Sequence, residues 1–348
     1  MHNLSIVILS LTLLGGCTQN ELSGRPDDAV VRGVNFVGKS VSNLEQSTDL
    51  YHNSVDLQWV QEAEFRQSAV IDALSGHEGT RASTRLMKSV NAQLQFMQFD
   101  NPPAQALSTK PVGVNGPGIA HVCYQVAQAT KAYDRFLEGG ATPIGDRDMV
   151  QLNKRNPVYY AYAHDHDNAV VEIEHVDIDA LNLPTPPKNQ YRIRHVSLAT
   201  PDIDRAVDFY SVLLQEEVPR RAGELLKLSG DKLDKISGLP SSKIEMAWFQ
   251  VRNLELEIIQ YHSHPVETPV SPRPLEALGY NMIVFDVADL SAARERLLKA
   301  GGKLVLETQP MDGGEILFGR DPDGNLLGFQ KISDDAPFSS QNFLDNGT

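Results

Sequence analysis

One arrangement of strand and helix patterns occurs four times along the 348-residue chain. Each copy opens with a short β-type run, continues with a helical pattern, and closes with extended segments. The opening runs are VRGVNFV, GIAHVCYQV, YRIRHVSLAT and YNMIVFDV, and the closing runs are NAQLQFMQF, NAVVEIEHVD, NLELEIIQY and GNLLGFQKI. This internal repeat predicts four similar modules that stack or pair with one another.

The helix signals are clearest in the third and fourth copies. In PDIDRAVDFYSVLL the apolar residues recur three and four apart behind Asp202, which can cap the first turn. In ADLSAARERLLKAGG the cap is Asp289 and the stop signal is the glycine pair that begins at Gly301. The segments QATKAYDRFLEGGATP and SNLEQSTDLYHNSV predict the second helix and a weaker first one.

Proline-rich stretches at 101–118, 181–190 and 264–274 separate the copies. Proline lacks the N–H that a β-ladder needs and disfavours helix before it, so these stretches read as connections. The predicted modules span residues 30–100, 118–177, 191–263 and 278–332, and a polar tail follows at 333–348.

The first seventeen residues, MHNLSIVILSLTLLGGC, form an apolar run too short for a stable membrane span and typical of a signal peptide. The ending LLGGC resembles the lipobox of bacterial lipoproteins, although no Lys or Arg precedes the apolar run. The resemblance implies acylation of Cys17 and, because Thr18 follows it, an outer-membrane lipoprotein that faces the periplasm or the surface, with residues 18–29 as a linker. The alternative is an uncleaved or misassigned start.

The cysteine content and the charge exclude two further features. If Cys17 is lipidated, Cys123 has no intrachain disulfide partner. The formal net charge is -14 at pH 7, and the chain has no cluster of Lys and Arg that would contact a phosphate backbone. Nucleic acid is therefore not an expected partner.

The segment FGRDPDGNLLGFQ, with its DPDGN turn before the final strand, is the most specific motif of the chain. Together with the repeats it resembles the vicinal oxygen chelate superfamily, which includes glyoxalase I, methylmalonyl-CoA epimerase, extradiol dioxygenases and fosfomycin and bleomycin resistance proteins. The resemblance covers residues 30–332. It implies an α+β fold in which four βαβββ modules form two half-open mixed-sheet barrels, with a divalent metal on a concave face.

In that family each module can supply one metal ligand from its first strand and one from its last. The resemblance therefore implies the ligands His121 and Glu172 from the second module, and His195 and Glu257 from the third. The matching residues of modules one and four cannot form an ordinary metal site: Asn35, Gln95, Asn281 and Gly328. A slip along the closing strands would select Glu174 or Glu255 instead, because residues two apart share a strand face.

The pairing of the modules decides whether these ligands meet. Pairing one with two and three with four would leave a half-site in each barrel. Pairing two with three, and one with four, collects all four ligands in one cavity, so we predict one complete site and one degenerate barrel. Two imidazoles and two carboxylates suit Zn, Ni, Mn or Fe(II).

The resemblance implies binding of a small molecule through adjacent oxygens. The leading hypothesis is a glyoxalase I-like lyase or isomerase, with Glu172 or Glu257 as the base that takes a proton next to a metal-bound carbonyl. The alternatives are an extradiol-type Fe(II) dioxygenase and a non-catalytic ligand-binding or resistance lipoprotein. Four modules complete both barrels within one chain, so a monomer suffices and a homodimer is compatible.

Three further segments have two interpretations each. His164 and His166 suggest a metal site, but they occupy the place of the DPDG turn, which favours a solvated turn. The insert at 222–243 is either a helical lid over the cavity or an outer-surface helix. Cys123 shares the strand face of His121 and either lines the pocket or is a buried structural thiol.

Overall fold

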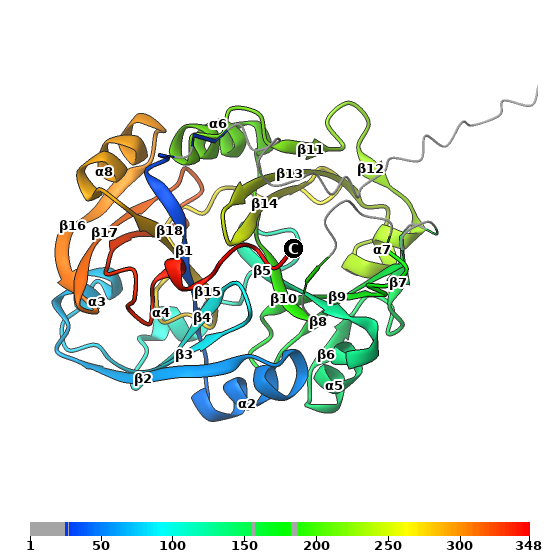
Figure 1. Cartoon of the computed structure of the whole chain (residues 1–348), viewed down its shortest axis with the longest axis horizontal. Helices are drawn as coiled ribbons and strands as arrows, with labels where there is room; N and C mark the ends of the chain where they lie inside the picture. Colours follow the sequence, from blue (N-terminus) through cyan, green and yellow to red (C-terminus); the bar gives the residue numbers. More distant parts are fainter. Residues whose placement is uncertain (1–24, 27, 153, 155–156, 182–186, 189) are drawn as a thin grey trace, which may run out of the picture.

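The computed structural model describes residues 25–26, 28–152, 154, 157–181, 187–188 and 190–348 (Figure 1). It is an α+β fold built on two mixed sheets of eight and ten strands, neither of which closes into a full barrel. In the described part of the chain, no helix is both long enough and apolar enough to cross a membrane. The predicted signal peptide and Cys17 lie outside the described residues.

The first and fourth repeats form the eight-stranded sheet, with strand order β16-β17-β18-β15-β1-β4-β3-β2. The first repeat comprises β1 (Val31–Ser40), α2 (Leu44–Val55), β2 (Gln58–Arg66), α3 (Ala69–Ser75), β3 (Arg81–Lys88) and β4 (Gln93–Phe99). The fourth comprises β15 (Gly279–Val287), α8 (Leu290–Lys299), β16 (Lys303–Met311), β17 (Gly314–Arg320) and β18 (Leu326–Lys331).

The second and third repeats form the ten-stranded sheet, whose main path is β11-β13-β14-β10-β5-β9-β8-β6. The second repeat comprises β5 (Gly118–Ala127), η1 (Gln128–Thr130), α5 (Ala132–Glu138), β6 (Thr142–Ile144), β7 (Val150–Gln151), β8 (Val158–His164) and β9 (Val170–Val176). The third comprises β10 (Tyr191–Ala199), α6 (Ile203–Leu214), β11 (Arg220–Ala222), β12 (Leu228–Ser229), α7 (Asp231–Ser237), β13 (Lys243–Val251) and β14 (Leu254–Tyr261). Two short helices lie outside the repeats, α4 (Ala104–Ser108) and η2 (Ser340–Asn342).

The strand directions show how the repeats combine. Within each repeat the first strand runs parallel to the last, as in β5 with β9 and β10 with β14. Between repeats the two first strands meet antiparallel, β5 with β10 and β1 with β15. Module two therefore pairs with module three, and module one with module four. This pairing places the strands of His121 and His195 side by side at the centre of one sheet.

The helix ends follow the sequence signals. The side chain of Asp202 accepts a hydrogen bond from the backbone N–H of Arg205 at the start of α6, and that of Asp289 accepts one from Ala292 at the start of α8. Helix α5 has no side-chain cap and extends over only seven residues. Both predicted caps are thus confirmed, and they fix where the chain leaves the first strand of each repeat.

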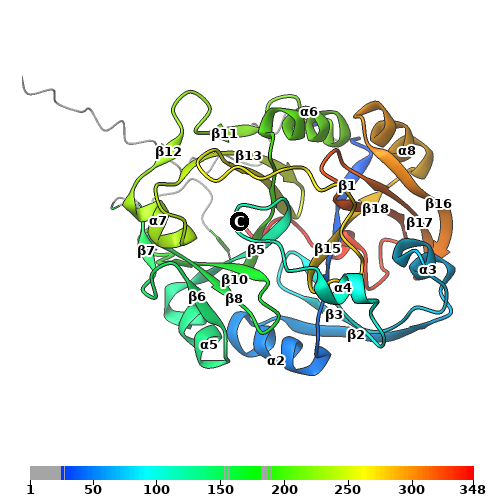
Figure 2. The ribbon, with the colours of Figure 1, turned by 180° about the vertical axis from the view of Figure 1, so that it is seen from behind.

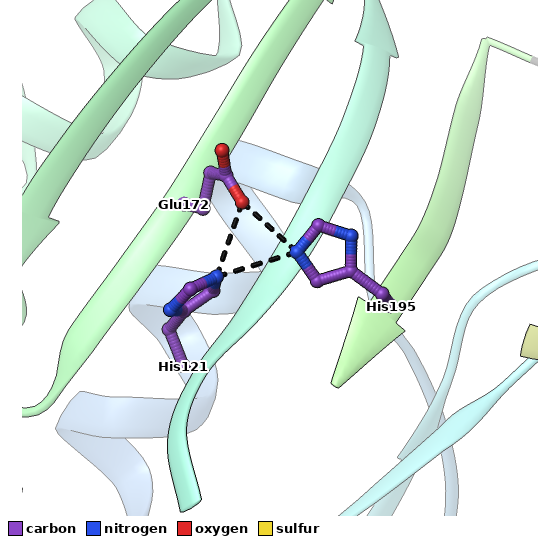
Figure 3. Close-up of side chains that lie close together, drawn as sticks. All are labelled: His121, Glu172 and His195. Atoms are coloured by element: carbon purple, nitrogen blue, oxygen red, sulfur yellow. Dashed lines mark hydrogen bonds and ion pairs between the residues drawn. The ribbon is translucent and has the colours of Figure 1, made fainter. Parts of the chain in front are cut away.

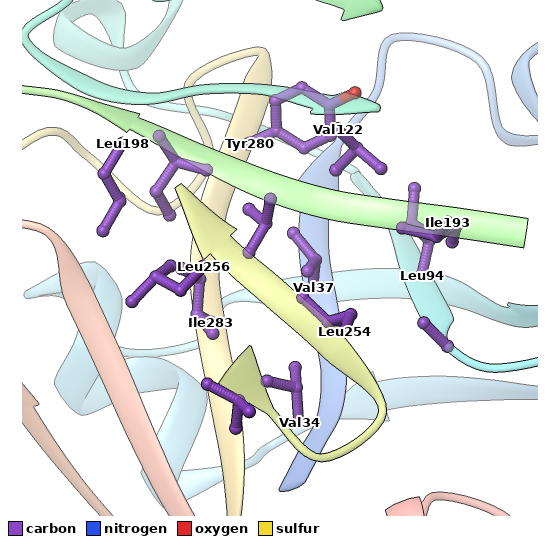
Figure 4. Close-up of a cluster of buried hydrophobic side chains, with 14 of the residues drawn as sticks. Val34, Val37, Leu94, Val122, Ile193, Leu198, Leu254, Leu256, Tyr280 and Ile283 are labelled. Carbon is purple, nitrogen blue, oxygen red and sulfur yellow. The ribbon is translucent and has the colours of Figure 1, made fainter. Parts of the chain in front are cut away.

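The outer faces of the two sheets pack against each other through one apolar core (Figure 4). Val37 and Ile283 project from the eight-stranded sheet, and Val122, Ile193 and Leu256 from the ten-stranded sheet, each at most 1 % exposed. Helix α2 packs on α5 and α6 on α8, as both views show (Figures 1 and 2). This core stabilises the central strands, because burial of apolar side chains is the main favourable term in folding.

The DPDGN segment forms the predicted turn before β18. Asp321 accepts hydrogen bonds from the backbone N–H groups of Asp323, at 3.0 Å, and Asn325, at 2.9 Å. The hydroxyl of Tyr210 on α6 also donates to Asp321, at 2.8 Å. The turn therefore fastens the fourth repeat to the helix of the third.

The segment around His164 and His166 forms the matching turn before β9. Asp165 accepts from the backbone N–H groups of Asp167 and Ala169, both at 3.0 Å, and from the hydroxyl of Tyr51 on α2, at 2.8 Å. The ring nitrogens of both histidines contact backbone carbonyl oxygens, at 3.0 Å for His164 and 2.8 Å for His166. These contacts agree with the turn interpretation.

Candidate metal centre

Cross-strand register brings the predicted ligands together on the concave face of the ten-stranded sheet. Along β5 and β10, His121 lies opposite Ser197 and His195 opposite Cys123, after a register shift between Ile193 and His195. On the outer sides, Glu172 of β9 lies beside Cys123 and Glu257 of β14 beside Ser197. The two histidines and two glutamates thus surround the same point from four neighbouring strands.

The side-chain atoms of these four residues approach one another closely. The Nε2 atoms of His121 and His195 lie 3.3 Å apart, and Glu172 Oε2 lies 3.1 Å and 3.0 Å from them respectively (Figure 3). Glu257 Oε2 lies 3.6 Å from His121 Nε2 and 3.5 Å from His195 Nε2. These side chains form a compact cluster, called the cage below: the ligand atoms of His121, His195 and Glu172 lie within 4.8 Å of one another, and Glu257 approaches both histidines.

These distances match the edges of a metal coordination shell. An ion with bonds of about 2.0–2.2 Å places neighbouring ligand atoms about 2.8–3.6 Å apart, in octahedral or tetrahedral geometry. The observed separations of 3.0 Å to 3.6 Å lie within that range. The triangle of His121, His195 and Glu172 therefore fits the edges of a coordination shell, and Glu257 lies within reach of both histidines.

The cage is sealed from solvent, since His121 is 0 %, His195 2 %, Glu257 4 % and Glu172 6 % exposed. Burial disfavours the charged form of Glu172, but hydrogen bonds from both histidines outweigh it and hold the pKa of this carboxyl below its usual range. Burial likewise opposes protonation of His195, but Glu257 and Glu172 raise the pKa of its imidazole above the ordinary value. Metal binding at these ligands therefore competes with protons.

A sequence profile described as the Glyoxalase/Bleomycin resistance protein/Dioxygenase superfamily matches residues 33–173 and 192–329. The chain belongs to this superfamily. The vicinal oxygen chelate assignment from the sequence is thereby confirmed.

Two similar proteins share 33% and 14% of their aligned residues with the chain. An ethylmalonyl-CoA/methylmalonyl-CoA epimerase from Cereibacter sphaeroides is 33% identical over 76 residues, which are 22% of this chain and 54% of the epimerase, so the chain spans about half the length of this curated relative. The crystal structure of glyoxalase I from Zea mays aligns with a TM-score of 0.59 at 14% identity, over 86% of this chain and 92% of that one. This likeness shows the fold.

The two neighbouring glutamates pair with arginines. Glu174 pairs with the guanidinium of Arg194 and accepts a hydrogen bond from Gln125 at 2.6 Å. Glu255 contacts Arg194 at 3.3 Å and Arg220 at 3.0 Å. Burial raises the pKa of Glu255, but Arg220 and Arg194 outweigh it and lower it to about 2. The structure thus gives Glu174 and Glu255 arginine partners and leaves Glu172 and Glu257 for the cage.

Several groups beside the cage were not singled out by the sequence analysis. The indole Nε1–H of Trp248 donates to Glu257 Oε1 at 2.9 Å. The hydroxyl of Ser197 is fully buried and has no hydrogen-bond partner among the described residues. Trp248 could have been found by pairing AWFQV with LELEIIQY as a hairpin, because that register sets Trp248 opposite Glu257.

Cys123 is fully buried, and in the sheet it lies between His195 of β10 and Glu172 of β9. Burial raises the pKa of its thiol well above the ordinary value, and the carboxylates of Glu172 and Glu174 add to the shift. A thiol held neutral in this way acts as a small apolar group in the floor of the site.

The insert at 222–243 covers one end of the concave face. Ile236 of α7 is buried in a cluster with Tyr162, Val170 and Val114, on the same side of the sheet as Glu172. Leu225 and Leu226, in the loop before α7, are 94% and 83% exposed. Helix α7 therefore packs on the face of the sheet that carries Glu172.

The concave face of the eight-stranded sheet is filled by its own core. This cluster includes Phe36, Met97, Met282, Val284 and Phe318. Phe338 from the C-terminal segment adds a ring 5.4 Å from that of Phe36. Among the described residues of this sheet, no three His, Cys, Asp or Glu ligand atoms gather within 4.8 Å of one another.

The polar residues of that sheet bind protein groups. Asn35 donates to Gln330 at 2.9 Å and accepts from the backbone N–H of Ser340 at 2.8 Å. Asn281 donates to Ser40 at 2.7 Å. Gln95 and Gly328 carry no ionisable ligand atom. At the positions that match the cage, modules one and four therefore have neither histidine nor glutamate.

Proposed function

We propose that this protein is a metal-dependent lyase or isomerase of the glyoxalase I type, which removes a proton next to a carbonyl group of a small substrate with adjacent oxygens. The observation that carries this proposal is the cage of His121, Glu172, His195 and Glu257, in which each glutamate has an oxygen 3.0 Å to 3.6 Å from both histidine nitrogens, on one face of a superfamily fold. The donor set fits Zn, Ni, Mn or Fe(II).

The bound ion would supply Lewis-acid polarisation of the substrate oxygens. The chain itself supplies the proton acceptor, since Glu172 and Glu257 are carboxylates held in a water-poor pocket. Tyr162 and Ile236 supply apolar walls that exclude water from the reacting carbon. The free hydroxyl of Ser197 is in position to donate a hydrogen bond to a polar group bound beside Glu257.

A second candidate is an extradiol-type Fe(II) dioxygenase. The triangle of His121, His195 and Glu172 alone matches the two-histidine, one-carboxylate pattern of non-haem iron oxygenases. The family resemblance, however, places the dioxygenase ligands on the third and fourth modules, where this chain has Asn281 and Gly328. We therefore rank this candidate below the lyase.

The test is a screen of the metal-loaded protein against α-oxoaldehyde thiol adducts and catechols. We expect conversion without oxygen uptake, a primary isotope effect when deuterium replaces the hydrogen next to the carbonyl, and loss of turnover in Glu172→Gln and Glu257→Gln. Oxygen uptake with a catechol would establish the dioxygenase instead. Tight binding without conversion across the screen would favour a sequestering protein.

We also propose, from the sequence, that the mature protein is anchored to the outer membrane through a lipid on Cys17. The support is the apolar segment ending in LLGGC. Cell fractionation tests it: the wild-type protein is expected with membranes and the Cys17→Ser variant in the soluble fraction. Identical distribution of the two would refute the anchor.

A further inference from the structure

Two adjacent leucines are exposed in the loop that joins β11 to β12, residues 223–227, which we call the tip loop. Leu225 is 94% and Leu226 is 83% exposed. The tip loop stands out from the body of the molecule in both views (Figures 1 and 2). Neither leucine belongs to an apolar cluster of the described residues. Large apolar side chains that gather on a surface in this way indicate a contact with another apolar body.

Ion pairs hold both ends of the tip loop in place. Arg221, just before the loop, and Lys227, at its end, both contact the buried carboxylate of Glu245, each at 2.5 Å. Arg221 also pairs with Glu224 inside the loop, at 3.5 Å. The charged groups around the two leucines are thus paired with one another. A loop of this kind presents an apolar tip with balanced charge, which suits a lipid interface better than a strongly charged partner.

The start of the described chain lies beside the tip loop. Pro26 and Glu224 line the same surface groove, together with Val218, which is 77% exposed. Arg25 ties this part of the chain to the body by hydrogen bonds to three backbone carbonyl groups. Cys17 precedes Pro26 by nine residues, and a chain of that length spans about 30 Å at most. A lipid on Cys17 would therefore keep the tip loop close to the bilayer.

We propose that the tip loop is a second membrane contact, in which Leu225 and Leu226 insert into the bilayer surface while a lipid on Cys17 anchors the chain. This inference rests on the proposed lipid anchor and adds the face of the protein that meets the membrane. Removing a leucine side chain from water strengthens an association at least about tenfold. A stable pair of protein chains needs about 800 Å² from each partner, far more than two leucines supply. The lipid surface is therefore the occupant that fits this loop.

The test places a fluorescent label on the full, lipidated chain and measures its surroundings on vesicles of phosphatidylethanolamine and phosphatidylglycerol in equal parts. A nitrobenzoxadiazole label on Leu225→Cys reacts at one site, because Cys17 is acylated and Cys123 is fully buried. The matched control is Leu107→Cys on α4, since Leu107 is 71% exposed and α4 lies well away from the tip loop in both views (Figures 1 and 2). With vesicles we expect the label at position 225 to emit at shorter wavelength and to be quenched by a spin-labelled lipid. The label at position 107 should do neither.

A second substitution tests whether the leucines themselves drive the insertion. The quenched fraction of the label gives the equilibrium constant between inserted and free tip loops. Adding Leu226→Ser to the labelled Leu225→Cys variant should lower this constant at least about tenfold, whereas adding Leu107→Ser should leave it unchanged. Equal effects of the two serine substitutions would overturn the inference.

The remaining outcomes separate this inference from the anchor on which it rests. If the wild-type protein sediments with the vesicles but the labels at positions 225 and 107 behave alike, the tip-loop contact is wrong and the anchor stands. If the emission shift at position 225 occurs without vesicles and grows with protein concentration, the occupant is a second copy of the chain and the lipid contact is wrong. If the wild-type protein does not sediment with vesicles, the anchor is wrong and this inference falls with it.

Discussion

Replacement of Lys39 by Met tests how the two halves of the molecule are joined. Lys39 on β1 is 0 % exposed, and its ammonium group contacts the Asp165 carboxylate and the hydroxyl of Tyr51, the latter at 2.7 Å. The same ammonium lies 4.7 Å from the Tyr51 ring centroid and 5.2 Å from that of Tyr280. Lys39 is thus a buried cation from the first repeat that neutralises the turn before β9 in the second.

The Lys39→Met variant keeps a similar apolar volume and removes the charge. The carboxylate of Asp165, whose side chain is 3 % exposed, then stays buried without its cation. Removing one partner of a buried pair costs about 3–5 kcal/mol of unfolding free energy. The double variant Lys39→Met with Asp165→Asn removes both charges, and we expect it to recover most of that loss, because replacing a whole buried pair is often close to neutral.

The measurement is urea unfolding of the metal-free protein followed by circular dichroism, with free energies compared at constant m-value. The matching turn before β18 shows how such an aspartate can be held without a lysine, since Asp321 accepts hydrogen bonds from Tyr210 and Asn325. A single variant within about 1 kcal/mol of wild type, or a double variant no more stable than the single one, would refute the described role of this pair.

Two further predictions follow from the buried carboxylates. Because Glu174 and Glu255 both bind Arg194, Glu174→Gln and Glu255→Gln are each expected to lower the unfolding free energy by about 1–3 kcal/mol. Neither should change the Zn²⁺ affinity by more than about threefold, unlike changes at Glu172 and Glu257. Equal loss of metal in all four variants would contradict the assignment. Burial raises the pKa of Asp321 from 3.8 to about 6, despite hydrogen bonds from Asn325 and Tyr210. Because the pKa is higher in the folded state, Asp321 stabilises the fold below about pH 4, and that stability is lost as pH rises through about 6. Between about pH 4 and about pH 6, the unfolding free energy of Asp321→Asn should therefore rise by about 3 kcal/mol relative to that of the wild type. A difference between the two proteins that does not change with pH would disprove this prediction.

Much of the fold was predictable because its signals are local. The four repeats, the caps at Asp202 and Asp289 and the DPDGN turn each depend on residues close together in the sequence. The choice of module pairing needed one further argument, namely that a metal site must collect all its ligands in one cavity. The eight- and ten-stranded sheets show that pairing.

The remaining features depend on register between distant segments, which no local pattern encodes. Lys39 has a charged side chain, yet it is fully buried in the fold. Its partner Asp165 is 126 residues away in the sequence and lies beside it in space. The tail at 333–348 has a polar composition, but Phe338 and Ser340 are at most 3 % exposed. Such contacts become visible only when the sheets are assembled.

The metal content of the purified chain tests the central claim most directly. After equilibration with Zn²⁺ and removal of free ions, elemental analysis should give one ion per chain in the wild type and in a control that carries His164→Ala and His166→Ala. It should give none in His121→Ala or in His195→Ala. A wild-type chain without bound metal, or an ion retained when either His121 or His195 is replaced, would contradict the assignment of the four-residue cage.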